Sequence, residues 1–110
     1  MAKLELISSA QVNLLNEWLD LKSALEGSSS NTLLAYKRDL IDFFSFLTLH
    51  TGCKSGVSQL EAVDQASMRS WMAENRRSGK TSRSIARQLS SVKSFYKWFA
   101  KRRGIDPTMV

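Results

Sequence analysis

Between Ile85 and Phe99 the apolar residues recur at the spacing of one face of an α-helix. Ile85, Leu89, Val92, Tyr96 and Phe99 are separated by four, three, four and three positions. This spacing places their side chains in a single stripe. Such a stripe is stable only when another surface covers it, so the segment is predicted to be an amphipathic helix packed on a core. One proline and five glycines in 110 residues leave long helices uninterrupted and favour an all-α fold.

The opposite side of this predicted helix carries positive charge and small hydroxyl groups. Residues 75–105 contain no Asp or Glu but ten Lys and Arg, whereas the rest of the chain has six basic and ten acidic residues. The net charge of +6 is therefore +10 in this segment and −4 elsewhere. Charge gathered on one segment indicates a polyanionic partner, most commonly nucleic acid. A basic face that is merely solvated is the alternative.

The composition indicates one soluble domain with a modest core. Hydrophobic residues make up 43% and charged residues 24% of the chain, which is typical of a globular protein. No apolar run approaches the roughly 20 residues that span a bilayer, and the first residues do not resemble a signal peptide. The single Cys53 has no partner for an internal disulfide, which fits a reducing compartment. We expect a cytoplasmic protein without a membrane partner.

Four helices are expected, with an arm at residues 1–8 and the helical domain at 9–103. The first helix runs over about 9–25, with Leu14, Trp18, Leu21 and Leu25 on its buried side and Leu15 and Leu19 widening it. Gly27 is expected to end it. The second begins at Ser30 or Asn31 as its N-cap and stops at Gly52, with a core face of Leu33, Tyr36, Leu40, Phe43, Phe44 and Leu47.

A loop at 51–62 is expected to precede the third helix, which Asp64 caps. Val63 and Met68 occupy the positions of a hydrophobic staple around that cap. Thr81 or Ser82 caps the fourth helix, which Gly104 ends. Residues 104–110 are expected to begin a linker to a further domain, since Pro107 cannot continue the helix.

Two helix faces are candidates for binding an anion. The start of the second helix offers backbone N–H groups and a favourable dipole, together with Asn31, Thr32 and Arg38. The outer face of the fourth helix offers Arg83, Arg87 and Lys97, with Ser90 and Ser94 small enough to let a phosphate approach.

The residues of a catalytic or metal site are not evident. His50 is the sole histidine, and no second His or Cys stands at a ligand spacing, so we expect no metal and no cofactor. Tyr36 and Tyr96 both fall within apolar stripes and are expected to be core residues with a polar tip. This chain alone is therefore not expected to be an enzyme.

Two blocks of sequence resemble the tyrosine recombinase (phage integrase) family. Residues 30–47, SNTLLAYKRDLIDFFSFL, are similar to the pattern S-x-x-T-x-x-x-Y-x-x-D-L-x-x-F-x-x-F-L, although Thr32 stands one position early. Residues 79–99, GKTSRSIARQLSSVKSFYKWF, are similar to G-x-S-x-x-S/T-I-x-R-x-L-S-A-L-R-x-F-Y-x-F-L of Xer-type members. Asp106-Pro107 stands where the family often has Asn-Pro, so the resemblance spans about residues 10–107.

The resemblance implies a SAM-like core-binding domain, a bundle of four to five helices that forms half of a clamp around duplex DNA. Its catalytic counterpart, with the nucleophilic tyrosine, would follow Pro107, and the parent protein would be a DNA breaking-rejoining recombinase that acts with other protomers. Carried over by position, the resemblance gives a DNA-binding set of Asn31, Thr32, Arg38, Lys80, Thr81, Ser82, Arg83, Arg87, Ser90, Ser94 and Lys97. The helical periodicity selects the same face of the fourth helix independently.

Two other functions remain open at this point. A helix-turn-helix regulator would also bind DNA, but the long segment 51–62 does not match the short turn expected of it. Alternatively, a helical interaction module could dock its basic face on an acidic protein. Neither the target site nor the type of recombinase can be read from the residues.

Overall fold

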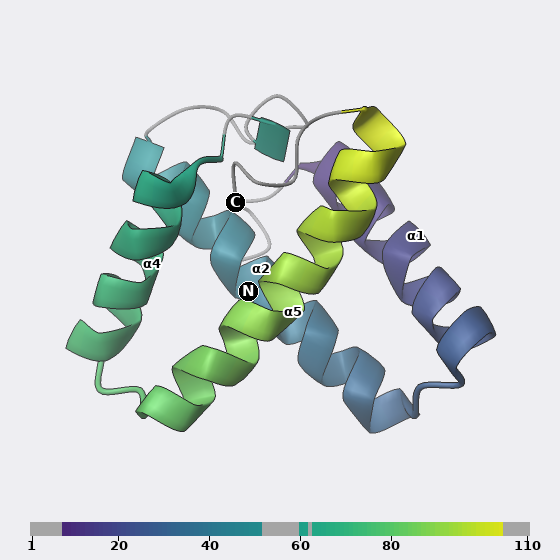
Figure 1. Ribbon diagram of the computed structural model, residues 1–110, viewed down its shortest axis with the longest axis horizontal. Helices are drawn as coiled ribbons and strands as arrows, with labels where there is room; N and C mark the ends of the chain where they lie inside the picture. The colour runs from purple at the N-terminus through teal and green to yellow at the C-terminus, as the bar shows by residue number, and fades with distance from the viewer. Residues whose placement is uncertain (1–7, 52–59, 62, 105–110) are drawn as a thin grey trace. The chain divides into compact units, whose positions relative to one another are not determined.

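The computed structural model describes residues 8–51, 60–61 and 63–104, and across these residues the chain is all-α (Figure 1). The helices are α1 (Ser9–Glu26), α2 (Ser30–Thr51), α4 (Gln65–Arg77) and α5 (Ser82–Arg103). The all-α prediction is confirmed. The chain divides into two compact units, Met1–Leu60 with α1 and α2, and Glu61–Val110 with α4 and α5. Residues 1–7 of the expected arm (1–8), residues 52–59 of the expected loop (51–62), Cys53 and Asp106-Pro107 lie outside the described residues.

In the first unit, α2 turns back from α1 after a connection of three residues (Figure 1). Ser8 caps α1 in a reciprocal pair: its hydroxyl accepts the N–H of Gln11, and the Gln11 side chain accepts the N–H of Ser8. This capping box satisfies two backbone donors that the helix leaves without partners. Gly27 ends the helix in the left-handed conformation, as expected.

The buried side of α1 differs from the prediction. Leu15, Trp18 and Leu19 are buried together with Gln11. Leu21 is 39% exposed and Leu25 is 75% exposed, so their assignment to the core was wrong. Leucines lie on most sides of α1. The spacing of the apolar residues alone therefore does not determine which side of the helix faces the core. The inward placement of Gln11 is compatible with burial because its side chain is held by the cap.

An aromatic and ionic contact joins α1 to α2. The rings of Trp18 and Tyr36 lie with their centroids 5.3 Å apart. The ammonium of Lys22 lies 5.6 Å from the Trp18 centroid and 5.9 Å from that of Tyr36, a cation–π arrangement. It also pairs with the Glu26 carboxylate at 2.7 Å. On α2, the expected core residues Leu40, Phe43, Phe44 and Leu47 are buried, while Leu33 and Tyr36 are half-buried.

In the second unit, the local signals at the helix ends are confirmed. Asp64 caps α4 by accepting the N–H of Ser67 at 2.9 Å, and Val63 and Met68 on either side of this cap are both buried. Thr81 caps α5, and Gly104 ends it in the left-handed conformation. The apolar face of α5 is buried as predicted, except that Leu89 is half-buried. It further includes Gln88, Ser91, Phe95 and Ala100.

Aromatic rings make up the last two turns of the buried face of α5. Phe95 stacks on Phe99 with centroids 5.8 Å apart, and Tyr96 meets Phe99 edge-on at 5.7 Å. Burial raises the pKa of the Tyr96 hydroxyl far above its ordinary value, because the phenolate would lose its hydration. Tyr96 thus has the core position that the sequence predicts for it.

Candidate nucleic-acid interface

The outer face of α5 carries exposed cations along a helix of about 33 Å. Of the fourth-helix residues predicted to bind DNA, most are exposed and two, Lys80 and Ser94, are half-buried. The exposed ones are Thr81, Ser82, Arg83, Arg87, Ser90 and Lys97. The face that the sequence selects is therefore on the surface, as binding to an external polyanion requires.

A shallow depression marks the first turn of this face. It has a volume of about 380 Å³ and is lined by Thr81, Arg83, Ser84 and Arg87. Two arginines, a threonine and a serine thus line one concave surface at the amino end of a helix. Guanidinium groups form charge-assisted, often bidentate hydrogen bonds with phosphate oxygens. The helix dipole adds a partial positive charge at the same end.

The cap of α5 fixes how these groups are presented. The Thr81 hydroxyl oxygen accepts the backbone N–H of Ser84 at 3.1 Å, and the Thr81 carbonyl accepts the N–H of Ile85 at 3.0 Å. Because a hydroxyl group is both donor and acceptor, Thr81 retains its own hydrogen for an external acceptor. Ser84 lines the depression although the sequence analysis did not select it. The i, i+3 relation to its cap, Thr81, is the signal that would have found it.

The start of α2 has the same kind of cap, one residue earlier than predicted. Ser29 is the N-cap: its hydroxyl accepts the N–H of Thr32 at 3.2 Å and its carbonyl accepts the N–H of Leu33 at 3.0 Å. The Ser29 and Thr32 hydroxyl oxygens also lie 2.9 Å apart. The predicted contacts Asn31, Thr32 and Arg38 are all exposed. They belong to the first unit and the α5 residues to the second, so the structure does not test whether the two sets meet on one ligand.

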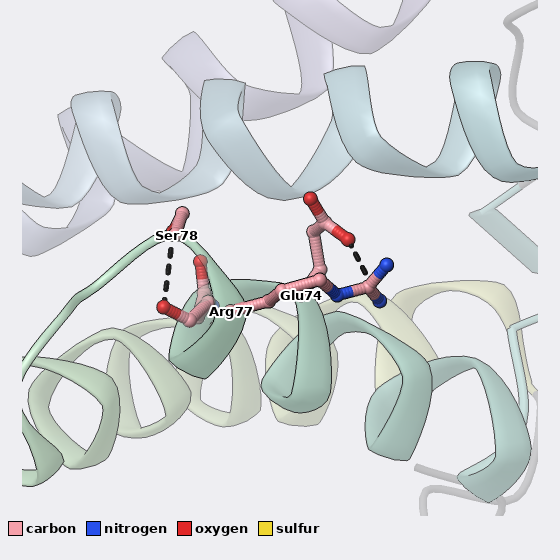
Figure 2. Close-up of polar contacts among 4 residues, drawn as sticks. Glu74, Arg77 and Ser78 are labelled. Atoms are coloured by element: carbon pink, nitrogen blue, oxygen red, sulfur yellow. Dashed lines mark hydrogen bonds and ion pairs between the residues drawn. The ribbon is translucent and has the colours of Figure 1, made fainter.

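Two carboxylates form ion pairs with arginines of the second unit. Glu74 pairs with Arg77 at 3.0 Å at the end of α4, and Glu61 pairs with Arg103 at 3.3 Å at the end of α5 (Figure 2 shows the first pair). Within the described residues, no hydrogen bond or ion pair engages the Arg83 side chain. The Arg83 guanidinium is therefore exposed and is not neutralised by a carboxylate of the described residues.

A metal site and a membrane-spanning helix each require a particular arrangement of the described residues. Among them, no group of three or more His, Cys, Asp or Glu side chains is placed to hold a metal ion. None of the helices formed by these residues is both long enough and apolar enough to cross a bilayer. His50 stacks on Phe46 with ring centroids 5.0 Å apart, at the exposed end of α2.

Comparison with known proteins relates the segment that contains α1, α2, α4 and α5 to one family. The chain is 34% identical over 88 residues to tyrosine recombinase XerC of Rickettsia typhi, covering 80% of this chain and 29% of that protein. It is 35% identical over 79 residues to XerC of Rhodospirillum centenum, covering 72% and 23%. For XerC of Brucella suis the identity is 35% over 86 residues, covering 78% and 27%. The chain thus spans less than a third of the length of these relatives.

No solved structure gives a significant match to the chain. The family described as "Phage integrase, N-terminal SAM-like domain" matches residues 15–104, from the middle of α1 to the residue that ends α5. Since this match covers most of the chain, the protein belongs to the phage integrase N-terminal SAM-like domain family, whose relatives here are tyrosine recombinases.

Proposed function

We propose that this chain is the DNA-binding part of a tyrosine recombinase and that it holds duplex DNA through the outer face of α5. The observation that carries the proposal is the depression at Thr81, Arg83, Ser84 and Arg87, where two arginines border the amino end of a helix. Asn31, Thr32 and Arg38 of α2 add contacts. Most of these contacts are to phosphate, which positions the protein without reading sequence. Arg83 or Arg87 is the residue suited to bidentate recognition of guanine.

Catalysis belongs, in this proposal, to a domain that follows the chain in a longer cytoplasmic protein. The relatives are named recombinases and are more than three times as long as the matched segment. Residues 9–103 form the DNA-binding domain, residues 104–110 begin the linker, and the bound partners are duplex DNA and further protomers. The two described tyrosines do not serve as the nucleophile: Tyr96 is buried, and Tyr36 packs on Trp18.

The test is the salt dependence of duplex binding by the 110-residue chain. If about five phosphates are contacted, the logarithm of affinity falls against the logarithm of salt concentration with a slope near −4 to −5. Fluorescence anisotropy of a labelled duplex of mixed sequence measures this slope. A flat dependence would overturn the proposal.

The same titration separates the two rival functions. A helical module that docks its basic face on an acidic protein would still bind polyglutamate at a salt concentration that abolishes duplex binding, and the proposal requires the reverse order. A helix-turn-helix regulator is the other rival. The long segment 51–62 counts above as evidence against a helix-turn-helix. It does not exclude one, because α4 and α5 are joined by only residues 78–81. Family membership, and not this spacing, is what disfavours the regulator.

A further inference from the structure

Lys93 is an exposed cation of α5 that the predicted DNA-binding set does not include. Its side chain is on the surface, and among the residues that the structure describes no hydrogen bond or ion pair engages it. Residues 75–105 contain no Asp or Glu, so its own helix offers no carboxylate to neutralise it. The charge of Lys93 is therefore presented to solvent, where it can attract an external anion.

Lys93 lies on the flank of the outer face that is opposite the depression. Positions 87, 90 and 93 follow one another at intervals of three residues, and each is rotated by about 60° around the helix axis from the one before. Arg87, which lines the depression, and Lys93 are therefore about 120° apart, with Ser90 between them. All three residues are exposed, whereas Ser91 and Val92 on the inner side of the helix are buried. The outer face thus has a cation on each flank and a small side chain in the middle.

The spacing of these two cations matches the width of the major groove of DNA. Six positions at 1.5 Å each separate Arg87 and Lys93 by about 9 Å along the helix axis. With side chains that end about 5–6 Å from the axis, the rotation separates the charged groups by roughly 9–10 Å across it. Together these give a separation of roughly 13 Å, and the major groove is about 12 Å wide. A helix in the groove can therefore place one cation near each phosphate backbone, while Ser90 leaves room for the base edges.

We propose that Lys93 binds a phosphate of the DNA strand opposite the strand held at the depression, so that α5 reaches across the major groove from one backbone to the other. This inference rests on the proposed function. It adds to that function a residue outside the predicted set and a division of the contacts between the two strands. The depression holds the first strand through Arg83 and Arg87, and Lys93 holds the second.

Neutralising one DNA strand separates the two groups of contacts. One duplex of mixed sequence is ordinary DNA, and a second of the same sequence carries uncharged methylphosphonates in place of every phosphate of one strand. On the ordinary duplex, Lys93→Met is expected to reduce the magnitude of the salt slope by about 0.9, the value for one phosphate contact. On the half-neutral duplex the depression, with its two arginines, takes the charged strand and Lys93 faces the neutral one. Lys93→Met is then expected to leave the slope unchanged.

Two further variants provide the reference and the control. Arg83→Met removes a cation that faces the first strand, so it is expected to reduce the slope on both duplexes. Arg69→Met removes the same charge from an exposed position on α4 outside the predicted set, and it is expected to leave both slopes unchanged. Lys93 is exposed, so its substitution should not shift the melting midpoint measured by circular dichroism. Lys93→Gln takes its place if the methionine variant melts at a lower temperature.

The outcomes distinguish this inference from the proposed function. An equal reduction of the slope by Lys93→Met on both duplexes would assign Lys93 to the same strand as the depression and overturn the inference. It would also be overturned if Lys93→Met had no effect on the ordinary duplex, or only the effect of Arg69→Met. A wild-type chain whose binding to the ordinary duplex does not depend on salt would instead refute the proposed function itself.

Discussion

The hydroxyl of Thr81 accepts the backbone N–H of Ser84 at 3.1 Å, and both side chains border the depression at the start of α5. One hydrogen bond therefore serves two purposes. It satisfies a backbone donor that the helix cannot satisfy itself, and it holds the Thr81 hydroxyl group at the depression that Arg83 and Arg87 also line. Stability and the proposed binding surface depend on the same residue.

Replacing Thr81 with alanine is expected to lower the free energy of unfolding by about 1 kcal/mol, the usual cost of losing a hydroxyl N-cap. Urea unfolding followed by circular dichroism measures this change. Thr81→Ser is the matched control, since serine supplies the same oxygen. A Thr81→Ala variant as stable as the serine variant would show that the cap contributes nothing to folding.

Arg83→Ala is expected to weaken duplex binding and to reduce the magnitude of the salt slope by about 1. The unfolding midpoint should stay unchanged, because Arg83 is exposed and has no partner among the described residues. Arg69→Ala is the control: it removes the same charge from an exposed position on α4 that lies outside the predicted set. Equal losses of affinity in the two variants would mean that only net charge matters, and not the outer face of α5.

Phe99→Ala is expected to lower the free energy of unfolding by about 3–5 kcal/mol, the range found when a buried aromatic ring is deleted. Phe99 is fully buried and contacts the rings of both Phe95 and Tyr96. Since a small domain is stable by only about 5–15 kcal/mol, this loss should move the midpoint of urea unfolding to a much lower urea concentration. Leu49→Ala, at a residue that is 70% exposed, should differ from wild type by less than about 0.5 kcal/mol.

The cap of α4 predicts a dependence of stability on pH. Hydrogen bonds from the backbone N–H and then the hydroxyl of Ser67 lower the pKa of Asp64 below its ordinary value of 3.8. A carboxylate with a lowered pKa in the folded state stabilises the fold above its unfolded pKa, and this contribution disappears as pH falls through the folded value.

Asp64→Asn tests that dependence directly. Asparagine caps a helix about as well as aspartate but does not titrate. The variant should therefore lose less stability than wild type when urea unfolding is repeated at successively lower pH below about 5. If the free energy of unfolding fell by the same amount with pH in both proteins, Asp64 would contribute nothing to the loss of stability in acid.

The helix ends could be predicted from the sequence because their signals are local. Asp64, Thr81 and Gly104 each act through backbone groups within a few residues, so the chain carries the needed information in short segments. The outer face of α5 was also predictable, because its charges and its apolar stripe follow one helical period. Prediction missed the N-cap of α2 by one residue, since three serines precede Asn31 and each is a good cap.

The remaining features depend on contacts that span more than one turn. Leu21 and Leu25 were predicted to be buried, but the capping box at Ser8 and Gln11 and the contact of Trp18 with Tyr36 set the rotation of α1. The hydrogen bond from the Lys80 ammonium to the Gln88 side-chain carbonyl requires the folded connection between α4 and α5, which no periodicity reveals. The predicted contacts with DNA remain predictions.

Gly79 in that connection has a φ of +89°, and its N–H donates to the Arg76 carbonyl at 3.1 Å. A methyl group at the L position of its Cα would meet no atom within 4 Å, so an L side chain there would cost backbone strain and not a steric clash. L-alanine would be strained in this conformation, whereas D-alanine favours it. Gly79→Ala should therefore lower the free energy of unfolding by more than about 0.4–1 kcal/mol, through backbone strain alone.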